Sequence, residues 1–167
     1  QRVKYFGTNK KYPESYIRGR QAMDYIKYSA DKDYLAVVLP WLEQSVNDRG
    51  VNADNDVIQK YFELLEHRYQ SDKAKYSESF INTYLELGDL VDKRIAMGDN
   101  YKEAYTITRN NLNAMFINSG AADCSTLEGV FAAKVEENRN NDVELEKIIN
   151  LFDKADCKES EVYFTAS

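Results

Sequence analysis

Residues 33–47, which read DYLAVVLPWLEQSVN, decide the fold class. Their apolar residues recur three and four positions apart, at Leu35, Val38, Leu39, Leu42 and Val46. This period places them on one face of an α-helix, which has about 3.6 residues per turn. Pro40 lies inside the stripe. Because proline lacks a backbone N–H and clashes with the preceding turn, we expect it to kink or divide this helix.

Similar apolar stripes fill most of the chain on both sides of this stretch. They predict helices over residues 14–28, 55–70 and 76–97, from 101 to the Ser119-Gly120 turn, over 125–137, from 142 through 152, and from about 160 onward. Ser125 and Glu128 have the spacing of a capping box, and Asp142 is expected to cap the helix that follows it. The sequence therefore predicts an all-α protein of about seven to eight helices.

Composition favours one helical domain over residues 1–167. The chain is 43% hydrophobic and 30% charged, with only 2 prolines and 7 glycines, which suits long helices and short connections. Its net charge of -6 argues against a surface for nucleic acid or anionic lipid. No stretch approaches the roughly 18 apolar residues of a membrane span. We therefore expect neither nucleic-acid binding nor direct membrane insertion, and the pattern specifies no oligomeric state.

Little in the sequence points to catalysis. His67 is the single histidine, and Glu63, four residues earlier, shares its helical face. One histidine and one carboxylate fall short of a zinc triad, so a charged surface pair is the better interpretation. The chain has no Gly-x-Ser-x-Gly elbow, no phosphate loop and no dinucleotide fingerprint. We expect a non-catalytic protein without metal or cofactor.

Three short motifs resemble those of tetratricopeptide repeats, which are helical hairpins of about 34 residues. Asp33-Tyr34-x-x-Val37-x-x-x-Trp41 resembles the start of a repeat's second helix, and Gly98-Asp99-Asn100-Tyr101-x-x-Ala104 resembles it again. Between them, Tyr84-x-x-Leu87-Gly88 resembles the first-helix motif. Tyr34 and Tyr101 are 67 residues apart, close to two repeats. This resemblance implies a stack of antiparallel helical hairpins, an α-solenoid. An irregular helical bundle with chance matches is the alternative.

Four further segments, spread over most of the chain, resemble tetratricopeptide-type proteins of the Bacteroidetes cell envelope more closely. They are residues 2–7, 118–124, 142–145 and 157–161, of which Ser-Gly-Ala-Ala-Asp-Cys, residues 119–124, is the most specific. Such proteins are generally longer, so the resemblance implies a fragment truncated at both ends. It also implies a periplasmic or outer-membrane-associated scaffold that binds a protein or peptide partner. A glycan- or ligand-binding envelope lipoprotein on the same helices is the alternative.

Cys124 and Cys157 are the only cysteines. If the chain is exported, a disulfide between them would close a loop of about 33 residues and stabilise the fold by roughly 3 to 4 kcal/mol in the chain-entropy model. Two reduced, partly buried thiols are the alternative, because sequence does not supply the Cα separation that a bridge requires.

Aromatic residues are the remaining candidates for contact with a partner. The chain has 13 tyrosines, and most of the aromatics lie in helical stripes where core packing is the default. An aromatic shelf with neighbouring Asn and Asp would favour sugar, whereas a concave face of mixed charge and small residues would favour peptide. We expect binding in the groove between the first helices of successive hairpins. The candidate partner-binding aromatics are Tyr12, Tyr16, Tyr28 and Trp41.

Overall fold

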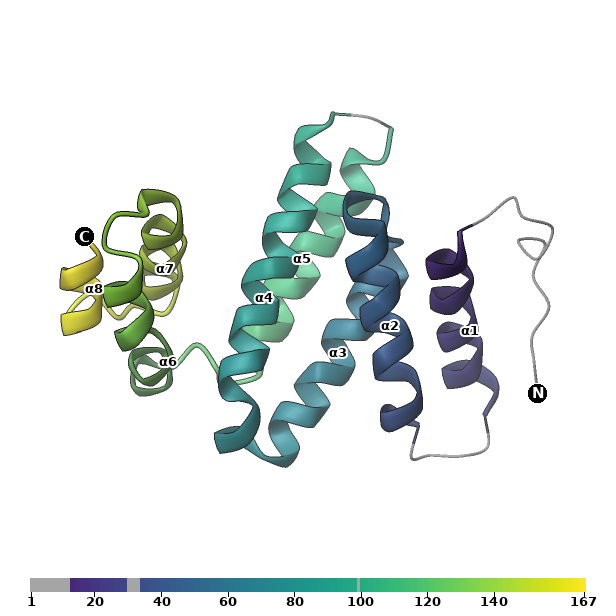
Figure 1. Ribbon diagram of the computed structural model, residues 1–167, viewed down its shortest axis with the longest axis horizontal. Coiled ribbons are helices and arrows are strands. Elements are labelled where there is room, and N and C mark those ends of the chain that lie inside the picture. The colour runs from purple at the N-terminus through teal and green to yellow at the C-terminus, as the bar shows by residue number, and fades with distance from the viewer. Residues whose placement is uncertain (1–12, 30–33, 99) are drawn as a thin grey trace.

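The computed structural model describes residues 13–29, 34–98 and 100–167. Within these ranges every regular element is helical and there is no strand, which confirms the all-α prediction (Figure 1). None of the helices in the described ranges combines the length and apolar composition needed to cross a bilayer. Tyr12 and Asp33, which the sequence motifs include, lie outside the described residues.

The described residues form eight α-helices and one 3₁₀ turn. In chain order these are α1 Glu14–Tyr28, α2 Leu35–Arg49, η2 Gly50–Asn52, α3 Asn55–Ser71, α4 Lys73–Ala96, α5 Lys102–Asn118, α6 Cys124–Glu137, α7 Asp142–Lys154 and α8 Glu161–Ala166.

The first five helices share one core in which α3 is central. Helix α3 packs against α1, α2, α4 and α5. The odd-numbered helices therefore lie next to one another in the order α1, α3, α5. In Figure 1, α2 lies in front of α3 and α4 lies in front of α5. Large apolar side chains that are fully buried fill the space between the helices, among them Leu42, Ile58, Phe62, Phe80, Leu112 and Phe116.

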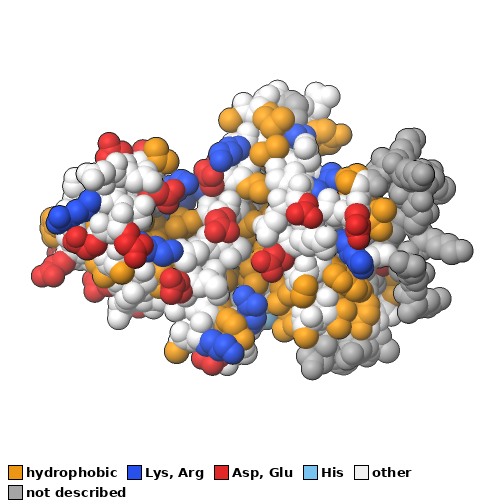
Figure 2. All heavy atoms as spheres, in the orientation of Figure 1, with side chains coloured by type: hydrophobic (Ala, Val, Ile, Leu, Met, Phe, Trp, Pro, Cys, Tyr) orange, Lys and Arg blue, Asp and Glu red, His pale blue; other side chains and the backbone are white. Residues whose placement is uncertain are grey.

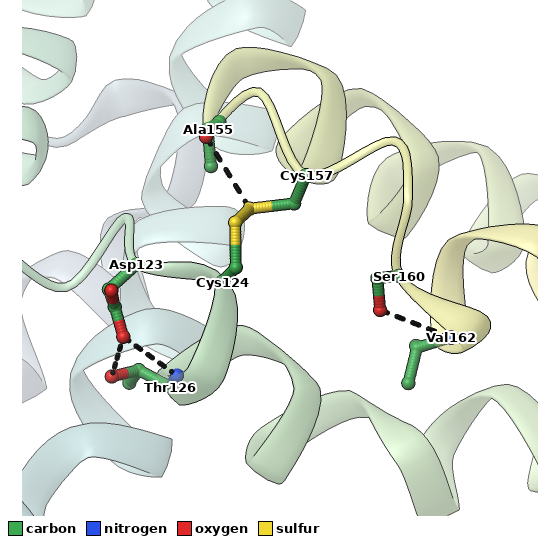
Figure 3. The surroundings of a disulfide bond; sticks show 7 residues. All are labelled: Asp123, Cys124, Thr126, Ala155, Cys157, Ser160 and Val162. Carbon is green, nitrogen blue, oxygen red and sulfur yellow. Dashed lines mark hydrogen bonds between the residues drawn. A yellow bond between two sulfur atoms is a disulfide. The ribbon is translucent and has the colours of Figure 1, made fainter.

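Helices α6, α7 and α8 form a separate C-terminal unit at the left of Figure 1, in which each helix packs against the other two. Phe131 and Phe152 meet edge to face in its interior, with ring centroids 6.1 Å apart. A disulfide joins Cys124, the first residue of α6, to Cys157 in the connection between α7 and α8, with their Cα atoms 5.5 Å apart (Figure 3). Of the two states of the cysteines, the structure contains the bridged one.

The residues that cap α6 and α7 lie one or two positions before the predicted ones. Asp123, not Ser125, caps α6, because its carboxylate accepts a hydrogen bond from the backbone N–H of Thr126 at 3.1 Å (Figure 3). Asn141, not Asp142, caps α7 by accepting from the backbone N–H of Glu144 at 3.3 Å. Both predicted caps were therefore wrong. In each case a short polar side chain one or two residues earlier reaches the free donor first.

Pro40 does not divide α2, which runs without interruption from Leu35 to Arg49. Proline lacks the N–H that would bond to the carbonyl four residues back, here that of Ala36 in the first turn. Both residues are exposed, so water can reach that carbonyl. One hydrogen bond near a helix start is a small loss, and the buried Val38, Leu39 and Leu42 hold the helix in place.

The two matching tyrosine motifs do begin helices. Tyr34 precedes α2 with φ -91° and ψ -7°, and Tyr101 precedes α5 with φ -96° and ψ 1°. However, α3 and α4 lie between these helices. In an uninterrupted series of two-helix repeats, α2 and α5 cannot then both be second helices. The contacts of α5 with α3 place it in the same layer as α1 and α3, so the expected assignment of the Tyr101 motif to a second helix does not hold.

Candidate functional site

A groove runs over α3 between α1 and α5, and we call it the odd-helix groove. It is a hollow of about 460 Å³. Helix α1 contributes one side chain, α3 four and α5 four: Met23, Asp56, Gln59, Lys60, Glu63, Asn111, Ala114, Met115 and Asn118. On α3 and on α5 these residues recur three and four positions apart, so each helix turns a continuous face toward the groove.

A polar ladder fixes α5 beside α3 beneath this groove. The hydroxyl of Thr108, which is fully buried, lies 2.8 Å from the side-chain oxygen of Asn55 and 3.1 Å from the side-chain nitrogen of Gln59. Asn111 donates to Gln59 at 2.7 Å. Tyr105 adds a buried hydrogen bond of 2.6 Å to the carbonyl oxygen of Ala53. Because buried polar groups are costly when unpaired, these bonds favour one register of the two helices.

The surface of the groove is mixed in character. Met23 and Met115 are half-buried, and they supply flexible apolar contacts from opposite sides of α3. Lys60 and Glu63 form an ion pair of 2.5 Å on the floor. Ala114 is exposed and leaves open space on the α5 side. The groove thus offers apolar, amide and charged surface within one hollow.

Arg20 ties α1 to the start of α3 at the edge of the groove. Its guanidinium lies 2.5 Å from a carboxylate oxygen of Asp56 and 3.5 Å from one of Asp54. Burial disfavours the charged guanidinium, but the hydrogen bond to Asp56 and the charges of both carboxylates outweigh burial and raise the pKa of Arg20. Arg20 therefore stays charged, and Asp56 is already engaged by the protein itself.

A second hollow, the α4–α7 cleft, separates α4 from the C-terminal unit. It consists of two adjoining parts of about 590 Å³ and about 400 Å³, which share Leu85, Asp89 and Lys147. Figure 2 shows acidic and basic side chains gathered along this boundary. The charged residues that line it are Glu86, Asp89, Asp92, Lys93, Arg109, Lys134, Glu144, Lys147, Asp153 and Lys154.

The candidate aromatics that the structure describes line neither hollow. The ring of Tyr16 lies under the guanidinium of Arg49, 5.1 Å from its central carbon. Trp41 is half-buried and meets Tyr25 edge to face at 6.1 Å. Tyr28 is 72% exposed at the end of α1. Their role in partner binding stays a prediction, as does that of Tyr12, which lies outside the described residues.

His67 is exposed on the same face of α3 as Glu63, but Glu63 pairs with Lys60. In the described part of the chain, no group of three or more His, Cys, Asp or Glu side chains is placed to hold a metal ion.

The sequence did not assign the lining residues to the odd-helix groove, and Glu63 was considered only as a neighbour of His67. One feature of the sequence indicates the polar contact beneath the groove. Thr108 places a hydroxyl in the apolar stripe of α5, and a buried hydroxyl requires a polar partner.

Comparisons with protein-family models, with curated proteins and with solved structures gave no match.

Proposed function

We propose that this protein is a non-catalytic, tetratricopeptide-like scaffold that binds a peptide segment of another protein in the odd-helix groove. The proposal places it at the cell envelope, in the periplasm or at the outer membrane, in keeping with the family it resembles. The disulfide supports this location, because such bonds persist mainly in oxidising compartments.

The side-chain chemistry of the groove carries the proposal. Asn118 has an amide that can donate and accept hydrogen bonds, as a peptide backbone does. The amide of Gln59 is engaged in the polar ladder, but the side-chain oxygen of Asn111, whose nitrogen donates to Gln59, can accept from a peptide. Met23 and Met115 can adapt to apolar side chains of different shapes. Lys60 and Glu63 present both signs of charge. These are the features expected of a peptide groove.

The same chemistry weighs against the glycan-binding alternative. Sugar recognition favours aromatic faces on which the ring can stack, and among the described residues no aromatic side chain lines the odd-helix groove. The peptide proposal is therefore preferred to a glycan- or ligand-binding envelope lipoprotein.

A random peptide library displayed on phage tests this proposal. The protein should enrich peptides that compete with one another and bind in isothermal titration calorimetry. Ala114→Arg places a long charged side chain in the groove, and because Ala114 is exposed the fold should persist. We expect this variant to lose at least tenfold in affinity for the enriched peptides.

The matched control is Ala104→Arg, which introduces the same side chain on an exposed position of the same helix outside the groove. It should bind the enriched peptides as the wild type does. Equal affinity of the wild type and both variants would place the binding site elsewhere, and failure to enrich any peptide would contradict the proposal.

A further inference from the structure

The C-terminal unit makes its main packing contact with the rest of the protein between α6 and α4. The unit has its own apolar interior, with Leu127, Phe131, Ile148 and Phe152 all buried, and its own disulfide. A group of helices with an internal core and a limited interface can move as one body.

Three lysines of the C-terminal unit reach toward α4. Lys134 on α6 donates to the side-chain oxygen of Asn82 at 2.6 Å. On α7, the amine of Lys147 lies 4.0 Å from a carboxylate oxygen of Asp89. Lys154, at the end of α7, donates to the hydroxyl oxygen of Tyr84 at 3.4 Å. Each contact joins a long, flexible side chain to a polar group on α4.

The two walls of the α4–α7 cleft also have opposite net charge. The α4 wall carries three carboxylates, on Glu86, Asp89 and Asp92, and one amine, on Lys93. The facing wall carries the same three lysines with Glu144 and Asp153.

Arg109 of α5 also lines the cleft. It is already held by Asp92, with 3.0 Å between its Nε and a carboxylate oxygen, and it therefore adds little free charge. Lys147 and Asp89 also have closer partners on their own helices, Glu144 at 3.3 Å and Lys93 at 3.0 Å. The net charges of the two walls still have opposite sign, so a modest attraction holds the C-terminal unit toward α4.

We propose that the C-terminal unit is a movable arm, held on α4 by these lysines and released when their charges are screened or neutralised. Of the three lysine contacts only Lys147 with Asp89 is an ion pair, while Lys134 and Lys154 bond to neutral groups. A partly exposed ion pair is weak, and its strength falls with ionic strength, as does the attraction between the oppositely charged walls, so a small change in conditions shifts the balance between closed and open arms. Opening exposes Leu85 and Leu90 of α4 and Val51 of η2, which are apolar residues of the cleft on the α4 side. The arm thereby controls access to an apolar strip on α4 and η2, independently of the odd-helix groove.

Single-molecule fluorescence transfer tests this proposal, with dyes attached through noncanonical residues at Ala104 on α5 and Ala133 on α6, both exposed. This labelling leaves the disulfide intact. Raising the salt from about 0.01 M to about 1 M shortens the screening length from about 30 Å to about 3 Å. We expect a severalfold rise in the open population. A dye pair at Asn47 and Ala104, both within the first five helices, should not respond.

Charge removal tests the same claim without salt. The variant Lys134→Met/Lys147→Met/Lys154→Met replaces each lysine by an uncharged, unbranched side chain one atom shorter, and it should be open at low salt, with little further response to added salt. Asp89→Asn should act in the same direction from the α4 side.

The matched control is Lys158→Met, which changes an exposed lysine of the same unit that does not line the cleft, and it should behave as the wild type. Identical dye separations in the wild type, the triple variant and Asp89→Asn, with no salt response, would overturn the proposal.

Discussion

The rings of Tyr84 on α4 and Phe116 on α5 stack face to face, with centroids 4.0 Å apart and planes within 4°. Phe80, one turn before Tyr84, stacks on Phe62 at 4.8 Å and on Tyr69 at 4.9 Å, both from α3. The hydroxyl of Tyr84 bonds to Asn113 at 2.7 Å and is also the acceptor for Lys154 of the C-terminal unit. One aromatic cluster thus joins α3, α4 and α5, and its edge contacts the arm.

Removing the central ring of this cluster should strongly destabilise the protein. Phe80 is fully buried, so Phe80→Ala leaves a cavity and should lower the free energy of unfolding by about 3–5 kcal/mol, measured by urea denaturation. Phe164→Ala removes a phenyl ring from a position that is 65% exposed, and it should change the free energy of unfolding by less than about 0.5 kcal/mol. Similar losses for the two variants would contradict the assignment of Phe80 to the core.

Replacing a helical glycine by alanine should lower the stability of the fold at one position, Gly19, and raise it at another, Gly129. At Gly19 a Cβ would lie 2.5 Å from Oγ of the buried Ser45 and 3.3 Å from Cγ2 of Val57, so Gly19→Ala should destabilise by about 1–3 kcal/mol. At Gly129 a Cβ meets nothing within 4 Å, so Gly129→Ala should stabilise by about 0.5–1 kcal/mol. Chemical denaturation of both variants checks the signs. A stabilising Gly19→Ala would mean that α1 and α2 are less closely packed than described.

The disulfide should stabilise chiefly the C-terminal unit. In the chain-entropy model a loop of this length contributes roughly 3–4 kcal/mol, and the three short helices of the unit have a small core. Reduction should therefore lower the melting temperature and produce an early transition while the first five helices stay folded. Thiol titration of denatured, unreduced protein should find no free thiol. Two titratable thiols in protein purified from an oxidising compartment would reject the bridge.

Stability should fall between pH 10 and 12 because of Tyr61. Burial, followed by the charge of Glu43, raises the pKa of this phenol to about 12, with Glu86 adding to the rise and Arg68 opposing it. In the unfolded chain the phenol titrates near 10, so above that pH the unfolded state loses a proton that the folded state keeps. The stabilisation is thus complete below pH 10 and is lost as the pH rises toward 12.

Urea midpoints measured at pH 9, 10 and 11 check this, with Tyr61→Phe as the comparison. The urea midpoint of the variant should fall less with rising pH than that of the wild type. An equal fall in both proteins would mean that groups other than Tyr61 cause the loss of stability.

Local sequence patterns predicted the helices well. The pattern over residues 14–28 predicted α1, which is observed as Glu14–Tyr28, because a 3.6-residue period is a property of neighbouring residues. The caps of α6 and α7 were missed by one or two residues because several short polar side chains compete at each start, and the backbone geometry decides between them.

A groove between the first helices of successive hairpins was expected, but the residues that line the odd-helix groove could not be predicted from local patterns. Met23 and Asn118 line one hollow although 95 positions separate them in the chain, and their proximity depends on how α1 and α5 pack on α3. The polar ladder beneath the groove depends on the same packing. Tyr16 and Trp41 were predicted to contact a partner because the chain is rich in aromatic residues. In the structure the ring of Tyr16 contacts Arg49 and that of Trp41 contacts Tyr25, both within the α1–α2 hairpin.

The central claim is that a peptide binds in the odd-helix groove, and the three methionines test it most directly. Met23 and Met115 line the groove, whereas Met97 is 55% exposed after the end of α4 and lines none of the hollows described above. In protein labelled with ¹³C at the methionine methyl groups, a library-selected peptide should shift the signals of Met23 and Met115 in NMR spectra and leave that of Met97 in place. Binding that shifts only Met97, or none of the three, would contradict the account.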